Sequence, residues 1–253
     1  MTSLQHPNPV HARIRGAFDA AMAEFNQSPA IRFLLSGEFE ARHYNAILRQ
    51  FYHYTKENPQ MQALAAVYFR GTDRQMVKPF MRHAISEVGH DHMALDDLEA
   101  LGEDTRGIAT ENPLPTTIAL TAFPFYQIQY QNPIGYLGYL YFLEHMPTIH
   151  GTSYAAALIA AGIPESGLGF LKEHMSVDMV HTRLMENYLD ALVHDDSDVA
   201  DIVYALQVGC QLYAQMLWGA IQHADKVAPY GFAGREVRRQ RIVATATAGE
   251  AGS

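Results

Sequence analysis

Apolar residues recur about every 3.6 positions along almost the whole chain, which is the period of a helix with one buried face. No stretch of useful length alternates apolar and polar residues as a half-buried strand would. Proline and glycine divide the pattern, because proline is favoured in a first helical turn and glycine just after a last one. We therefore expect helices over residues 10–26, 39–58, 59–70, 73–101, 115–131, 133–161, 168–193 and 197–225.

These helices predict an all-α fold, a single-domain bundle of about seven main helices. No linker, internal repeat or shift in composition divides the sequence. We expect the bundle to span residues 10–228. The N-terminus (1–9) and the tail (229–253), where the apolar period is lost, are expected to be mobile.

Composition excludes several classes of function. The chain carries 18 basic and 27 acidic residues, and no basic stripe precedes Arg235, so we expect no nucleic-acid partner. No apolar run reaches the roughly 18 residues of a membrane span, and the N-terminus has no signal-peptide core. The single cysteine, Cys210, cannot form an internal disulfide, which favours the cytoplasm. We expect Cys210 to be a small buried hydrophobe.

The expected helix over 168–193 carries polar residues on its apolar face. His174, Asp178 and His181 stand at positions i, i+4 and i+7, which share one face of a helix. Phe170 and Tyr188 lie on the same stripe. A charged group in such a stripe is costly unless it is paired or binds a metal, so this spacing points to a buried site.

Two other expected helices carry metal-competent residues on their apolar faces. Glu87 and His90 form a Glu-x-x-His pair, and Glu144 lies among bulky apolar residues in "YFLEHM". Together with the three residues on 168–193, they make three imidazoles and three carboxylates. Mixed nitrogen and oxygen donors suit iron or manganese. Helix bundles build two-metal sites from inward-facing residues of this kind.

The two motifs differ in specificity. Glu-x-x-His is weak evidence alone, since Glu40 and His43 also match it, and we interpret that second match as a surface pair. His-x3-Asp-x2-His is much rarer by chance in a chain of this composition. Its placement on an apolar face strengthens the prediction.

In type and order, these six residues resemble the haem-oxygenase-like diiron oxidases and oxygenases, over residues 10–225. The resemblance implies a seven-helix fold similar to haem oxygenase and the thiaminase-like proteins. It implies two ferrous ions per chain with O2 as co-substrate. It also implies a small-molecule substrate, amino-acid-derived or fatty-acid-like, changed by N-oxygenation, oxidative decarboxylation or C–C cleavage. Homodimers are common among such bundles. The implied iron ligands are Glu87, His90, Glu144, His174, Asp178 and His181.

Some residues near the motifs stay open at this stage. Glu57 is either a further carboxylate ligand or an exposed helix-end residue, and His83 is favoured as an imidazole that supports a neighbour. His92 and His145 should face away from the site. The aromatic stretch 123–142 is either a pocket wall or ordinary core.

Three alternatives remain. A haem-binding relative of the same fold would use His11 as proximal ligand and Gly135 and Gly138 for close approach. A metal-free thiaminase-like enzyme would need a nucleophilic cysteine, for which Cys210 is the one candidate. A ferritin-like iron-storage protein would carry a second Glu-x-x-His pair where this chain has His-x3-Asp-x2-His.

Overall fold

The computed structural model describes residues 8–225, and within 177–182 it describes the backbone alone. In the described residues the chain is helical and contains no strand, which confirms the all-α prediction. The predicted mobile ends, 1–9 and 229–253, fall almost entirely outside the described part. The elements in chain order are α1 (Pro9–Phe25), α2 (Pro29–Leu34), α3 (Ala41–Thr55), α4 (Asn58–Ala66), η1 (Gly71–Met76), α5 (Val77–Ser86), α6 (His90–Ala100), η2 (Ile108–Thr110), α7 (Pro115–Tyr130), η3 (Pro133–Gly135), α8 (Tyr136–Ala160), η4 (Glu165–Gly167), α9 (Gly169–Leu192) and α10 (Asp196–His223).

The helices begin where the sequence supplies caps. The Asn8 side chain accepts a hydrogen bond from the Val10 N–H, and Pro9 opens α1. Ser28 caps α2 in the same way, with Pro29 in its first turn. The Asp195 carboxylate accepts from the N–H groups of Ser197 and Asp198 at the start of α10. The short helix α2 was not predicted from the sequence.

The long helix predicted over 73–101 is broken, and this prediction was wrong. The chain forms η1, then α5, then turns at Gly89 before α6 begins at His90. Gly89 has φ of 100°, a left-handed conformation that costs other residues more than glycine. The apolar period continues on both sides of the turn, which is why the pattern alone suggested one helix. Glu87 and His90 therefore lie on either side of a turn.

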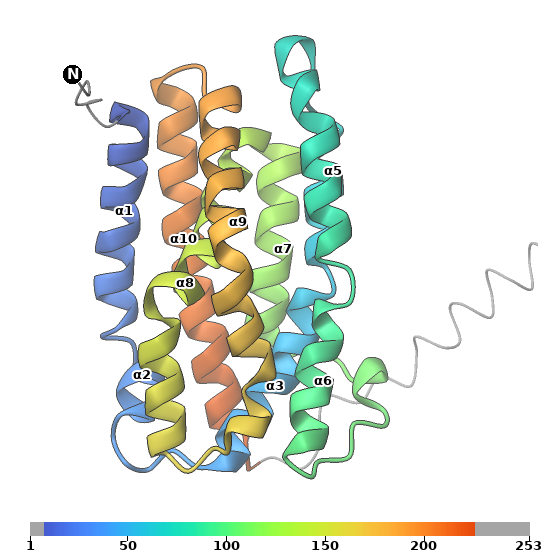
Figure 1. Ribbon diagram of the computed structural model, residues 1–253, viewed down its shortest axis with the longest axis vertical. Helices are drawn as coiled ribbons and strands as arrows, with labels where there is room; N and C mark the ends of the chain where they lie inside the picture. The colour runs from blue at the N-terminus through green and yellow to red at the C-terminus, as the bar shows by residue number, and fades with distance from the viewer. Residues whose placement is uncertain (1–7, 226–253) are drawn as a thin grey trace, which may run out of the picture.

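The centre of the bundle lies between α8, α9 and α10 (Figure 1). Helix α8 packs on both of the others, and α10 also contacts α1, α3 and α7. The close approach of α8 to α10 requires Gly138, because a Cβ there would lie 1.9 Å from the Ile202 carbonyl oxygen. Tyr136, Tyr139 and Phe142 of α8 are fully buried in this core. The packing fixes the position of Glu144, which lies further along the same helix.

Candidate metal centre

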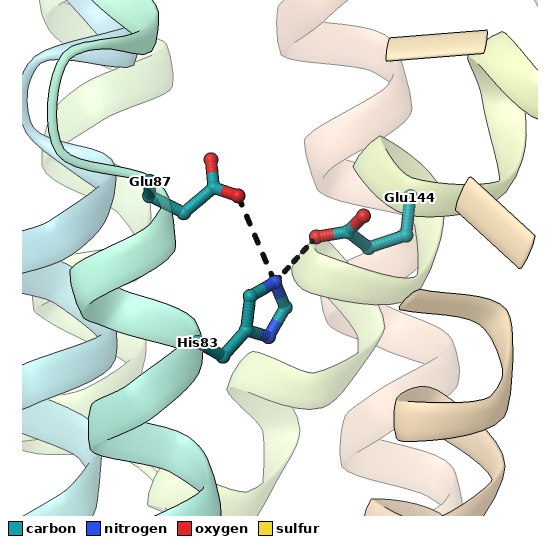
Figure 2. A group of neighbouring side chains, drawn as sticks. All are labelled: His83, Glu87 and Glu144. Atoms are coloured by element: carbon teal, nitrogen blue, oxygen red, sulfur yellow. Dashed lines mark ion pairs between the residues drawn. The ribbon is translucent and has the colours of Figure 1, made fainter. Parts of the chain in front are cut away.

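A buried cluster of three side chains joins α5 to α8. The Nε2 atom of His83 lies 3.1 Å from Oε1 of Glu144 and 3.7 Å from Oε1 of Glu87. Figure 2 shows the two glutamates reaching toward the His83 ring from opposite sides. The exposed fractions are 1% for His83, 6% for Glu87 and 7% for Glu144. One donor atom from each residue lies within 4.8 Å of the others, which makes the three residues a candidate metal-binding group.

Local structure positions each member of the cluster. His83 lies in the last turn of α5, and Glu87 is the residue that follows the helix, so the two side chains are one turn apart. The Glu87 N–H donates to the His83 carbonyl, which extends the helical geometry by one residue. Glu144 lies in the middle of α8, where packing against α9 and α10 leaves it little freedom.

Two further imidazoles lie on the other side of Glu87. The Nδ1 atom of His90 is 3.4 Å from Oε2 of Glu87, and the His90 ring meets the His174 ring edge-on, with centroids 5.1 Å apart. His174 Nδ1 lies 2.7 Å from the Phe170 carbonyl oxygen and donates to it. This hydrogen bond directs Nε2 of His174 away from the backbone of α9. Burial lowers the pKa of His174, so the ring is held in the neutral state that binds metals.

The structure thus brings together four of the six predicted site residues: Glu87, His90, Glu144 and His174. The other two, Asp178 and His181, lie among the residues whose side chains are outside the described part of the chain, so both stay predictions. Sequence reasoning favoured a supporting role for His83, yet its ring contacts both glutamates. The signal in the sequence was "HAISEVGH", which repeats the His-x3-acid-x2-His spacing.

The neighbouring histidines face elsewhere, and Glu57 is not among the residues that line the cavity. Glu57 is half-buried in the turn between α3 and α4, where Asn58 and Gln62 line the cavity described below. His92 has a side chain that is 72% exposed, as expected for a residue facing away. His145 is buried, but its ring stacks on Tyr141 at 3.7 Å and its Nδ1 donates to the Tyr141 carbonyl.

The interpretation of Glu40 and His43 as a surface pair was wrong for His43. His43 is buried, and its ring packs edge-on against Phe33. The Glu40 N–H donates to His43 Nδ1 at 2.9 Å, and the Glu40 side chain accepts from the His43 N–H. The two residues therefore form a capping box that begins α3.

A cavity of about 120 Å³ opens beside the cluster, enough room for a small organic molecule. Glu87, His90, Glu144 and His174 all contribute to its lining. Among the described lining residues there is no lysine or arginine, and the charged groups are acidic. The rest of the wall is mainly aromatic and aliphatic, with side chains that include Phe25, Ile31, Leu34, Phe39, Ile47, Phe51, Tyr54, Leu143, Phe170, Tyr213, Leu217 and Ile221.

The stretch 123–142 is ordinary core and surface. Of its residues in the described structure, Leu140 lines the cavity, whereas Tyr136, Tyr139 and Phe142 pack in the core. Tyr126 and Tyr130 are exposed on the outer side of α7. Of the two interpretations, the structure supports ordinary core for these aromatics, and the aromatic side chains that line the cavity come mainly from α1, α3, α9 and α10.

The residues suggested for a haem-binding site fit the structure poorly. His11, the candidate haem ligand, lies on α1 with its Nε2 atom 2.9 Å from the Asp190 carboxylate. Gly135 and Gly138 serve helix packing, against Gln127 and Ile202. Neither finding supports a haem pocket at these residues.

Cys210 is buried, as expected, and it faces away from the metal-competent cluster. Its thiol points toward the Ala21 carbonyl, in a hollow that it shares with Glu24. Burial raises the pKa of the thiol to about 12, so the reactive thiolate is scarce. This environment does not suit the nucleophile that a thiaminase-like reaction would need.

Comparison with known proteins assigns the chain to a family. A family model described as "iron-containing redox enzyme" matches residues 45–214, which is most of the chain. The chain belongs to this family. A comparison with curated proteins finds no match.

Solved structures confirm the fold of this iron-containing redox enzyme family member. A domain of unknown function with a haem oxygenase-like fold from Shewanella denitrificans OS217 is 25% identical, with a TM-score of 0.73, and the match covers 91% of this chain and all of that one. A TenA homologue from Pseudomonas syringae pv. tomato DC3000 is 12% identical, with a TM-score of 0.69 and coverage of 84% and 93%. A TenA homologue from P. horikoshii OT3 is 13% identical, with a TM-score of 0.68 and coverage of 84% and 98%. The last two likenesses show the fold alone.

The residues present fit the iron that the family's description implies. Two buried carboxylates lie in one cluster, and charges of one sign in a buried site call for a cation. Imidazole nitrogens and carboxylate oxygens together form a donor set that iron accepts. In the described residues, no helix combines the length and hydrophobicity needed to cross a membrane.

Proposed function

We propose that this iron-containing redox enzyme is a non-haem diiron oxidase or oxygenase that uses O2 to oxidise a small substrate with an apolar body. The observation that carries the proposal is the buried cluster of His83, Glu87 and Glu144, which has His90 and His174 beside it and lies next to an apolar cavity. Asp178 and His181 would complete the ligand set from the same helix as His174. Ferrous iron held by such donors supplies the electrons that activate O2.

The surrounding residues prepare the cluster for this task. The hydrogen bond from His174 Nδ1 to the Phe170 carbonyl, with the stacked Phe170 ring at 4.3 Å, holds that imidazole in one orientation. His83, Glu87 and Glu144 are buried, and the cavity beside them is lined mainly by apolar side chains. Reactive species formed in such a site are protected from side reactions with solvent.

The cavity supports an apolar-bodied substrate over a small amino acid. Its wall offers Phe, Tyr, Leu and Ile side chains for van der Waals contact, and no described lining residue is a cation that would pair with a free carboxylate. A charged head group would therefore depend on the metal ions themselves for its counter-charge. A zwitterionic amino acid without an apolar side chain would lose hydration with little gained in contact.

The function is tested by iron-dependent O2 consumption in a His174→Ala variant. Loss of this imidazole should lower the rate at least tenfold, because substituted metal ligands cost affinity and activity. His92→Ala is the matched control, since His92 is an exposed histidine on α6 and should leave the rate unchanged. Equal rates in the wild type and both variants, measured with an oxygen electrode, would contradict the proposal.

The substrate class is tested by thermal unfolding of the manganese-loaded protein, which avoids turnover during the scan. We expect decanoate or decylamine to raise the melting temperature in a concentration-dependent way, because a ligand that binds the native state stabilises it. Glycine and aspartate should have no effect. Stabilisation by the amino acids and not by the long-chain ligands would reverse the assignment.

A further inference from the structure

We infer that Glu87 bridges two metal positions and that His83 is a direct ligand of one of them. This inference rests on the proposed metal function. It adds His83 to the six ligands expected from the sequence, and it divides the described residues into two groups around one carboxylate.

The two oxygens of Glu87 face different histidines. Oε1 is 3.7 Å from His83 Nε2, and Oε2 is 3.4 Å from His90 Nδ1. Figure 2 shows one Glu87 oxygen directed at the His83 ring, with the other turned away from it. A carboxylate with one oxygen toward each of two imidazoles has the arrangement of a bridge, which binds one ion through each oxygen.

The distances on the His83 side suit a shared ion. Donors bound to one divalent ion at about 2.0–2.2 Å lie at most about 4.4 Å apart. His83 Nε2 lies 3.1 Å from Glu144 Oε1 and 3.7 Å from Glu87 Oε1, both within that limit. The first position would therefore be formed by His83, one oxygen of Glu87, and Glu144.

The second position takes the other oxygen of Glu87. His90 Nδ1 lies 3.4 Å from that oxygen, again within the limit, and the His174 ring is the next neighbour of His90. The break at Gly89 matters here, because it directs His90 away from the helical path of α5 while Glu87 caps the C-terminal end of that helix.

Packing fixes the orientation of the His83 ring, as is expected for a metal ligand. Its ring stacks on Tyr188 at 6.1 Å with an angle of 22° between the planes. Tyr188 is fully buried on α9 and packs against Phe80. A rigid imidazole aimed at two carboxylates loses little conformational entropy when a metal binds.

The inference is tested by counting ions and ligands, independently of turnover. The experiment compares the wild-type protein with the variants His83→Gln and His145→Gln after anaerobic dialysis against Co(II). The number of bound ions per chain is measured by metal analysis. The average number of nitrogen ligands per ion is measured by X-ray absorption spectroscopy. His145 is the matched control, a buried histidine next to Glu144 whose ring faces Tyr141. We expect two ions in the wild type and the control. His83→Gln should bind one ion at metal concentrations that fill the wild type, and its remaining site should keep wild-type nitrogen ligation.

Glu87→Gln provides a second, independent variant. Loss of a bridge should weaken both positions at least tenfold, whereas loss of a terminal ligand would weaken one. Two ions with unchanged affinity and ligation in His83→Gln would overturn the role of His83. Unchanged binding of one ion in Glu87→Gln would overturn the bridge. A wild type that binds no metal would instead defeat the proposed function, so the two failures are distinguishable.

Discussion

Adjacent residues on α8 show how orientation decides the role of an ionisable group. Glu144 faces the cluster, with an oxygen 3.1 Å from His83. His145, one position later, turns about 100° around the helix and stacks on Tyr141 instead. Burial lowers the pKa of His145 to about 4, so this imidazole is neutral in the folded protein at ordinary pH. Its part is to fill the core between α8 and α1.

The lowered pKa of His145 predicts a pH-dependent stability for the metal-free protein. Between about pH 6.5 and pH 4 the unfolded chain binds a proton at this residue and the folded chain does not. The free energy of unfolding should therefore fall as the pH falls through that window. The slope is about 1.4 kcal/mol per pH unit, and the loss amounts to about 3 kcal/mol in all. Urea titrations of the wild type and His145→Gln check this, and the variant should have the shallower slope. Equal slopes would show that His145 does not titrate in this way.

At the residue scale, sequence spacing predicted the members that share a helix face. His174 was found because its neighbours at helical spacing are apolar, and Glu87, His90 and Glu144 were found in the same way. The contact between His83 and Glu144 was not predicted, because it depends on a non-local fact, the approach of α8 to α5. Spacing within one helix cannot report the distance to a carboxylate on another. The same limit applies to Asn58 and Gln62, which line the cavity but carry no motif.

The turn between α5 and α6 is the local feature on which the cluster depends most. Gly89 adopts a φ of 100°, and a Cβ built there would meet nothing within 4 Å. If a larger residue at position 89 destabilises the protein, the cause is therefore the backbone conformation and not a steric clash of its side chain. The sequence pattern missed this turn because the apolar period is continued across it, and one glycine inside a helical pattern is an ambiguous signal.

Gly89→Ala should lower the free energy of unfolding by about 1–2 kcal/mol, because alanine is strained in the left-handed region. It should also weaken metal binding, since the turn sets His90 against Glu87. The matched control is Gly16→Ala, in the middle of α1 with open space around it. There alanine should stabilise the protein by about 0.5–1 kcal/mol through its higher helix propensity. Denaturant unfolding measures both, and a stabilising Gly89→Ala would contradict the account of the turn.

Element prediction elsewhere was accurate where local signals are strong. Prolines and capping side chains marked the starts of α1 and α7 and the turn before α10 within a few residues. The short helix α2 escaped notice because six residues are too few to establish a period. Its start signal, Ser28 followed by Pro29, is present in the sequence.

At the scale of the whole molecule, the bundle places a polar cluster against an apolar cavity. Helices α5, α6, α8 and α9 and the turn between the first two bring the metal-competent residues, while α1, α2, α3 and α10 add mainly apolar wall. The all-α class followed from the sequence period, but the cavity did not. Its wall comes from residues far apart in the chain, and single-helix patterns do not distinguish a side chain facing a cavity from one facing the core.

The measurement that tests the central claim most directly is an anaerobic Fe(II) titration of the purified metal-free protein, followed by exposure to O2 with the visible spectrum recorded. The account predicts binding that saturates at two ferrous ions per chain and a new absorption band that develops after O2 is admitted. Failure to bind iron, or bound iron with no change in the spectrum on O2 exposure, would contradict the claim that the His–Glu cluster is an O2-activating diiron centre.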